Sequence, residues 1–224
     1  MKQILNIKPL DIIPFPKGFV IVMGDSRDSK GNFKVTFKAF DFALNELTHI
    51  TKSVYLLNKF GPAYKSIADQ IGDYVSCAAG ILPNKKVQIV YPTGEMGTFD
   101  VDGTLLWTGD LIYHDSPVRS AAVDDKYIWC TVPKHNSIIR YSPTLKKVDF
   151  RIGGEKSSVF GRPMSICKVD NNLYVCNKGS LNISCVNLDN FVVSEYKTFD
   201  EPVLRYFQTL NKEIVVLASG VYIL

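Results

Sequence analysis

Residues 117–141 contain three short segments, PVRSAAVD (117–124), YIWC (127–130) and NSIIRY (136–141), whose composition predicts three strands separated by turns. The same order returns about 46 positions later as PMSICKVD (163–170), LYVC (173–176) and LNISCV (181–186). A unit that recurs at a spacing of about 20–50 residues is typical of a repeat architecture. The fold can therefore be derived by extending this unit along the chain.

Similar groups of short strands occur before and after the two matched units. The second strand of each group begins near Gly18, Lys86, Lys126, Asn172 and Glu213, which gives five units of roughly four antiparallel strands. In the first unit, residues 47–51 are expected to supply the fourth strand.

The last unit supplies three strands before the chain ends. The N-terminal strand at residues 2–9 belongs to no unit, and its pairing with residues 221–224 would close a ring and remove an open sheet edge.

This pattern predicts an all-β fold, a five-bladed β-propeller closed by pairing of the N- and C-terminal strands. Residues 1–224 are interpreted as a single propeller domain. An insertion is expected at residues 52–72, where residues 64–71 have the apolar spacing of a helix. An open β-sandwich is the alternative, because the boundaries of strands predicted from one sequence can shift by a few residues.

The composition is that of an ordinary globular protein. The chain has 46% hydrophobic and 21% charged residues, which argues against a disordered or a membrane-spanning chain. The longest apolar stretch, at residues 213–224, is too short to span a bilayer. The net charge of +4 is not concentrated in a basic run, so a nucleic-acid partner is not required. The start of the chain lacks the pattern of a secretory signal, which predicts a cytoplasmic protein, or a virion protein if the chain is a phage component.

The five cysteines recur at related positions of the repeat. Cys167 and Cys176 flank one predicted turn, and Cys176 and Cys185 flank the next, so the three thiols are expected to lie in a row on one face of a blade. Cys77 matches the repeat position of Cys167, and Cys130 that of Cys176. Because the Cys/His spacing of metal sites is missing, we interpret these residues as reduced packing residues and predict no metal site and no cofactor.

Five side chains are expected to meet where the inner strands begin, at one mouth of the propeller axis: Asp11, Tyr74, Arg119, Ser165 and Arg205. Two arginines beside a tyrosine and a serine are suited to hold a small anionic ligand, a carboxylate or a phosphate. The alternative interpretation is structural, with Arg119 and Arg205 paired to Asp11 or facing solvent. No catalytic residue is predicted in either case.

Two other segments have the composition of a site but are interpreted as connections. His114-Asp115 is expected to form a turn rather than an acid–base pair. GGEKSS at residues 153–158 lacks the spacing of a phosphate-binding P-loop and is not followed by a helical pattern, so it is expected to be a loop between blades.

Residues 116–141 and 160–183 resemble the NHL-type blade, which also occurs in gluconolactonase-like propellers. The matching features are the proline that opens the inner strand, the Val-Asp turn, the Leu-Tyr-Val strand and the asparagine-containing turn before isoleucine. Residues 99–106 look like the outer hairpin of the same repeat. The resemblance implies a propeller, and gluconolactonase-like propellers use Glu, Asn and Asp to hold a divalent metal over the axis.

Two functions of different classes follow. The first is a non-enzymatic binding or assembly module that acts through protein–protein contacts, including a structural part of a larger viral or phage particle. The second is a metal-dependent, lactonase-like hydrolase of a sugar acid, with Asp11, Asp110, Asp115 and Asn177 as the available ligands. Because no convergent catalytic set is visible in the sequence, the first function is favoured and the chain is expected not to be an enzyme.

Overall fold

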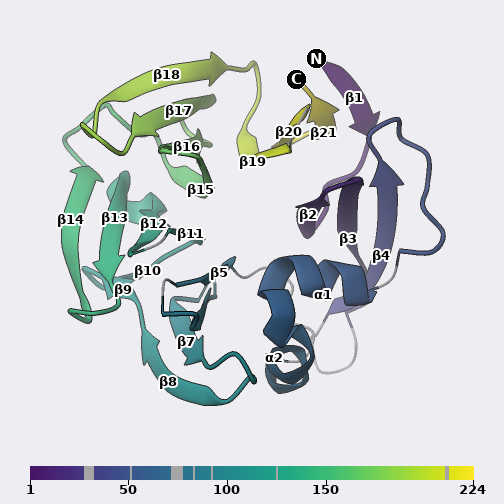
Figure 1. The fold of residues 1–224 in the computed structure, drawn as a ribbon. Helices are drawn as coiled ribbons and strands as arrows, with labels where there is room; N and C mark the ends of the chain where they lie inside the picture. The colour runs from purple at the N-terminus through teal and green to yellow at the C-terminus, as the bar shows by residue number, and fades with distance from the viewer. Residues whose placement is uncertain are drawn as a thin grey trace.

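The computed structural model describes residues 1–27, 33–50, 52–71, 78–82, 84–91, 93–124, 126–209 and 212–224. Within these residues, five antiparallel sheets stand as blades around a common axis (Figure 1). The predicted five-bladed propeller is confirmed.

Each blade is an antiparallel meander whose first strand lies nearest the axis (Figure 1). Blade 1 contains β2 (Asp11–Phe15), β3 (Gly18–Arg27) and β4 (Phe33–Asp41), and blade 2 contains β5 (Ala78–Ile81), β6 (Val87–Val90), β7 (Glu95–Phe99) and β8 (Leu105–Asp110). Blade 3 contains β11 (Ser120–Val123), β12 (Ile128–Val132), β13 (Ser137–Ser142) and β14 (Lys147–Gly153), and blade 4 contains β15 (Pro163–Val169), β16 (Asn172–Asn177), β17 (Asn182–Asn187) and β18 (Val193–Thr198).

Blade 5 is made from both ends of the chain. It contains β19 (Val203–Thr209), β20 (Lys212–Leu217), β21 (Gly220–Ile223) and the N-terminal β1 (Lys2–Leu5). β1 pairs antiparallel with β21, with Lys2 opposite Ile223 and Gln3 opposite Tyr222. The predicted closure of the ring by its two terminal strands is therefore confirmed, and Figure 1 shows the two ends side by side.

The first blade differs from the prediction. The expected fourth strand at residues 47–51 is wrong for the part that the structure describes, because residues 47–50 form no strand, and Thr51 lies outside the described residues. After β4 the chain reverses at a turn in which the Asp41 carboxylate accepts hydrogen bonds from the backbone and side chain of Asn45. A single bridge between Phe40 and Glu46 follows, and a helix then begins at Lys52.

Helices occupy the segment predicted as an insertion. α1 (Lys52–Phe60), the 3₁₀ turn η1 (Gly61–Ala63) and α2 (Tyr64–Ile71) follow one another, and α2 coincides with the segment of helical spacing. α1 lies against both β2 and β5 and stands between blades 1 and 2 (Figure 1). The other inner strands meet directly, β11 with β5 and β15, and β19 with β15 and β2.

The hydrophobic core follows this arrangement as a series of clusters at the junctions of the ring. Trp129 of blade 3 packs with Leu173 and Val175 of blade 4, and each is at most 1% exposed. Between blades 1 and 2 the helices supply the packing: Tyr55 lies against blade 1, and Ile67 lies against blade 2. The junction of blades 1 and 2 is thus filled by helices.

Candidate functional site

The face of the propeller where the inner strands begin carries most of the predicted site residues. Asp11 is the first residue of β2, Arg205 and Ser165 are the third residues of β19 and β15, and Arg119 directly precedes β11. Tyr74 lies outside the described residues. Because alternate strands of a meander run in opposite directions, the ends of β12 and β14 reach this same face.

Asp11, Lys59, Arg205 and Tyr55 form a group that we call the axial cluster. The Asp11 carboxylate is 1% exposed, and its two oxygens contact Lys59 Nζ at 2.6 Å and Arg205 NH1 at 2.7 Å. The Tyr55 hydroxyl donates a hydrogen bond to the same carboxylate at 3.3 Å, and so does the backbone N–H of Ile12 at 3.0 Å. A buried carboxylate is tolerated when it is paired and hydrogen-bonded, and this one joins blade 1, blade 5 and α1.

The structure brings only part of the predicted anion group together. Arg205 is joined to Asp11, as in the structural alternative, whereas the exposed Arg119 forms no ion pair with any described residue. Ser165 lies in the wall of β15 with its hydroxyl buried, and no hydrogen bond reaches that hydroxyl from the described part of the chain. Anion binding by Asp11, Tyr74, Arg119, Ser165 and Arg205 stays a prediction.

The cysteines form a different pattern from the predicted row of three thiols. Cys167 lies opposite Tyr174, and Cys176 lies opposite Ser165 and Ile183, because Val169 pairs with Asn172 and the turn between the two strands is therefore Asp170-Asn171. The row of thiols is therefore wrong.

Packing is nevertheless the role that the structure gives the buried cysteines. Cys130 and Cys176 are fully buried in junction clusters. Burial raises the pKa of Cys167 to about 11 and that of Cys176 to about 12, and it also raises the pKa of Cys130. These groups stay protonated and unreactive at neutral pH. Cys77 lies outside the described residues.

The side chains proposed as ligands of a hydrolase metal lie apart. Asp11 belongs to the axial cluster, Asp110 ends the outer strand β8, Asp115 lies in a turn, and Asn177 is buried at the end of β16. In the ranges that the structure describes, no three His, Cys, Asp or Glu side chains gather in a metal-binding group. No helix among these residues is long and apolar enough to cross a membrane.

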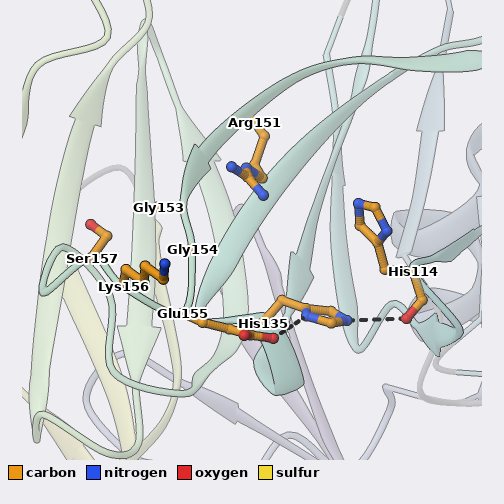
Figure 2. A pocket seen from close by; sticks show the side chains of 8 residues that line it. All are labelled: His114, His135, Arg151, Gly153, Gly154, Glu155, Lys156 and Ser157. Carbon is orange, nitrogen blue, oxygen red and sulfur yellow. Dashed lines mark hydrogen bonds and ion pairs between the residues drawn. The ribbon is translucent and has the colours of Figure 1, made fainter.

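A cleft of about 580 Å³ opens on the same face, beside blade 3. It is lined by eight residues, and we call it the face cleft: His114, His135, Arg151, Gly153, Gly154, Glu155, Lys156 and Ser157 (Figure 2). They come from three connections, namely the turn between β9 (Ile112–Tyr113) and β10 (Ser116–Pro117), the 3₁₀ turn η2 (Pro133–His135), and the end of β14 with the loop that leads to β15. His114 and Asp115 both have positive φ, so they form a tight turn as predicted, and GGEKSS is a loop between blades as predicted.

His135 holds these connections together. Its Nδ1 lies 2.9 Å from Glu155 Oε1 in the inter-blade loop. Its Nε2 lies 3.1 Å from the carbonyl oxygen of His114 and 3.3 Å from Ser116 Oγ. The imidazole is 17% exposed, whereas Glu155 is 69% exposed. The ring thus ties the loop to the β9–β10 turn and fixes the shape of the cleft wall (Figure 2).

The sequence of carboxylate, imidazole and hydroxyl has the order of a catalytic triad but not its chemistry. A triad histidine must accept the serine proton at Nε2. Here Nε2 also faces the His114 carbonyl oxygen, which can only accept a hydrogen bond. A hydrogen bond between the two therefore needs a hydrogen on Nε2, and a nitrogen that already holds a hydrogen cannot act as a base. Ser116 is moreover 2% exposed, so its hydroxyl is withdrawn from a substrate. The arrangement is suited to binding rather than to nucleophilic attack.

A second candidate surface lies on the outer strand of blade 2. β8 reads LLWTGD, and it has no charged residue before Asp110 at its end. Leu105 and Leu106 are 46% and 48% exposed, and the neighbouring Val101 and Ile112 are also exposed. The outer strands of the other blades all carry charged residues, namely Lys38 in β4, Lys147 and Arg151 in β14, Glu195 and Lys197 in β18, and Lys2 in β1.

A groove of about 410 Å³ runs along this strand on the side of α2, and we call it the edge groove. Its lining residues are Gln70, Tyr91, Glu95, Met96, Gly97, Phe99, Leu105, Thr108, Gly109 and Asp110. At the floor the Phe99 ring occupies the space beside Gly97, where a Cβ would lie 2.9 Å from the ring. At one end Glu95 of β7 lies directly opposite Asp110 of β8, which places two exposed carboxylates together.

Comparisons with known proteins support the fold and go no further. No protein-family model matches the chain, and no curated protein sequence matches it. Among solved structures, a streptogramin B lyase aligns with 93% of this chain and 73% of its own at 11% identity, with a TM-score of 0.50. Virginiamycin B lyase from Staphylococcus aureus aligns with 97% of this chain and 73% of its own at 14% identity, with a TM-score of 0.49. The computationally designed Ika8 protein aligns with 95% of this chain and 56% of its own at 11% identity, with a TM-score of 0.49. At these identities the similarity shows the propeller alone, and the NHL-type assignment of the repeat stays a prediction.

The sequence alone does not bring the residues of the face cleft together. His114 and GGEKSS are predicted as separate connections, and no role is predicted for His135 or Arg151. A usable signal was nevertheless present, because the turn after the second strand and the loop after the fourth strand of one blade must meet at the same end of the meander.

Proposed function

We propose that the chain is a non-enzymatic propeller that binds an extended segment of a partner protein along the outer edge of blade 2. The observation that carries the proposal is the apolar outer strand β8. Proteins usually protect sheet edges with charged side chains, because an unprotected edge pairs with other strands. In this propeller β8 is the outer strand that lacks this protection, and it exposes Leu105 and Leu106 instead.

The partner segment would add a fifth strand to blade 2. Its backbone would pair with the outward N–H and C=O groups of β8, which is the recognition mode called β-augmentation. Alternate side chains of the segment would enter the edge groove over Gly97. A lysine or arginine in the segment would lie between Glu95 and Asp110, two carboxylates that repel each other until a cation joins them. The proposed occupant is therefore an extended apolar segment with a basic residue at one end.

This proposal covers both a regulatory partner and a subunit of a larger viral or phage particle, because a strand on the edge would serve either. The free thiols of the described cysteines are compatible with the proposed cytoplasmic location.

The test uses a matched pair of edge substitutions. Thr108→Lys places a charge on β8, and Ser194→Lys places the same charge on β18; both positions are exposed on outer strands. Affinity capture of the full chain, followed by measurement of the affinity for the captured partner, should show about a tenfold or greater loss for Thr108→Lys, which corresponds to about 1.4 kcal/mol. Ser194→Lys should bind as the unmodified chain does.

Hydrogen exchange then locates the contact. Partner binding should slow the exchange of backbone amides in β8. Equal binding by both variants would contradict the proposal, as would a chain that captures no partner or one whose β8 edge pairs only with a second copy of itself.

A further inference from the structure

We infer that the face cleft binds the phosphate group of a small phosphate monoester. This site is separate from the edge of blade 2, since it lies on the loops of blade 3 and on the face where the inner strands begin. Its volume of about 580 Å³ is within the range of about 300–1,000 Å³ that is typical of small-molecule sites.

The first observation is a surplus of positive charge. Arg151 and Lys156 line the cleft, and neither forms an ion pair with a carboxylate in the described ranges. The Arg151 guanidinium has a weak contact of 3.5 Å with the Tyr113 hydroxyl. The one carboxylate in the lining, Glu155, is already held by His135 at 2.9 Å. The lining therefore has two cations and one carboxylate, and the carboxylate contacts His135 and not Arg151 or Lys156.

The neighbouring arginine shows the contrast. Arg140 lies on β13, beside β14, and its guanidinium contacts the Asp149 carboxylate through two nitrogens, at 2.9 Å and 3.3 Å. Blade 3 thus neutralises one arginine within its own sheet and leaves Arg151 open to the cleft. Arg151 therefore lacks a carboxylate partner among the described residues because of its position beside the cleft, since another arginine of the same sheet is paired.

The second observation is the shape of the loop. Gly153 has φ of +81°, and a Cβ there would lie 2.6 Å from the carbonyl oxygen of Asn136 and 2.8 Å from the Phe160 ring. Glycine therefore lets the chain leave β14 closely packed against η2. The next residues then reverse direction, with the Ser157 N–H bonded to the Gly154 carbonyl at 2.9 Å. This reversal places Lys156 across the cleft from His114 and below Arg151, so that three nitrogen-bearing side chains surround the open space (Figure 2).

The number and kind of these donors favour phosphate over carboxylate. Arginine offers a planar fork to two oxygens of an anion, and lysine offers a point charge to a third. A phosphate monoester at neutral pH has close to two negative charges and three terminal oxygens, which match one arginine and one lysine, with the His114 ring beside them. A single carboxylate would satisfy the arginine fork and leave the lysine unpaired.

His135 acts in this site as a positioning residue. It is held between Glu155 and the His114 carbonyl, so the two walls of the cleft are fixed relative to each other before a ligand binds. Preorganisation of this kind lowers the cost of binding because the loop does not have to be ordered by the ligand.

The test is a titration of the full chain with inorganic phosphate at constant ionic strength, followed by amide chemical shifts in NMR. At phosphate concentrations up to about 10 mM, a Kd of about 1 mM would give near saturation. Shifts are expected at Gly153, Gly154 and Ser157. Arg151→Gln and Lys156→Gln should each weaken binding about tenfold, because each removes one charge-assisted contact.

The matched control is Lys147→Gln, which removes one positive charge from the same strand outside the cleft. Its affinity for phosphate should change less than twofold, on the order expected for a screened distant charge. A parallel titration with acetate, a single carboxylate, separates phosphate from carboxylate recognition. The inference is overturned if phosphate produces no shifts in the cleft, if Lys147→Gln weakens binding as much as Arg151→Gln, or if acetate binds more tightly than phosphate.

Discussion

The axial cluster and the face cleft lie on the same face of the propeller, and both contain arginine, a carboxylate and a second basic group. In the axial cluster the Asp11 carboxylate is 1% exposed and contacts both Lys59 and Arg205. In the face cleft Glu155 is 69% exposed, is held by His135, and leaves Arg151 and Lys156 without acidic partners. Burial forces charges to pair, whereas charges at the mouth of a cleft can stay open for a ligand. The difference indicates that the first group holds the fold and that the second is available for binding.

The largest effect is expected from removing the centre of the axial cluster. Asp11→Ala would remove the carboxylate that contacts both the buried Lys59 ammonium and Arg205, and breaking a buried pair in this way costs about 3–5 kcal/mol. Urea unfolding measures the free energy of unfolding directly. The double variant Asp11→Asn with Lys59→Met should recover part of the loss, because it removes both charges of the buried pair. A loss below about 1 kcal/mol for Asp11→Ala is the value expected of an exposed ion pair, and it would contradict a structural role for the axial cluster.

A smaller effect is expected from the backbone of the face cleft. Gly153→Ala would put a Cβ into the Asn136 carbonyl and the Phe160 ring at a positive φ, which we expect to cost about 1–3 kcal/mol. The same change should weaken phosphate binding because the loop must shift. Thermal unfolding and the phosphate titration measure the two effects. The control Ser158→Ala, an exposed position in the same loop, should change neither, and a Gly153→Ala protein with unchanged stability would contradict the close packing.

The burial of the Cys176 thiol should make the free energy of unfolding depend on pH in the alkaline range. Burial raises the pKa of Cys176 to about 12, with a smaller opposing effect from the nearby Ser165 hydroxyl. An unfolded thiol ionises near pH 8.5, so this group stabilises the fold fully below that pH, and its contribution is lost as the pH rises toward the folded value. By pH 10 the loss from this one thiol should be about 1–2 kcal/mol.

The comparison with Cys176→Ala isolates that contribution. The variant is less stable at pH 7, but its stability should fall less steeply between pH 8 and pH 10 than that of the unmodified chain. Denaturant unfolding across this range gives the two slopes. Identical slopes would mean that the Cys176 thiol is accessible to water in the folded chain.

The smallest effect on stability is expected from the exposed carboxylate of the face cleft, Glu155. Glu155→Gln weakens a pair whose carboxylate is 69% exposed, so the free energy of unfolding should change by less than about 1 kcal/mol. The same substitution should strengthen phosphate binding, because removal of the carboxylate increases the surplus of positive charge in the cleft. Calorimetric titration checks this sign, and weaker phosphate binding would contradict the charge balance that we assign to the cleft.

The fold could be predicted from the sequence more completely than the sites. Two matched units at a spacing of about 46 residues, with an unassigned strand at the N-terminus and only three strands in the last unit, were enough to predict the ring and its closure. Residues 47–50 departed from the pattern because the turn around Asp41 leads into a helix and not into a strand. The register of the cysteines was missed because the turn between β15 and β16 is Asp170-Asn171, and a turn displaced by one residue moves the partner of Cys167 by two positions, from Cys176 to Tyr174.

The sites were harder to predict for a physical reason. Asp11 and Arg205 stand 194 positions apart, and the contact exists because the ring closes. Lys59 reaches the same carboxylate from a helix whose docking no repeat pattern describes. The face cleft depends in the same way on side chains from three connections, and the conformations of connections follow from their neighbours rather than from periodicity.

The most direct test of the contrast is a crystal of the chain soaked with sulfate. Our account predicts density for the anion in the face cleft, between the side chains of Arg151 and Lys156, and none beside Arg205, whose guanidinium is already bound to Asp11. Anion density between Arg205 and Arg119, with an empty face cleft, would contradict it and would support the axial mouth as the binding site instead.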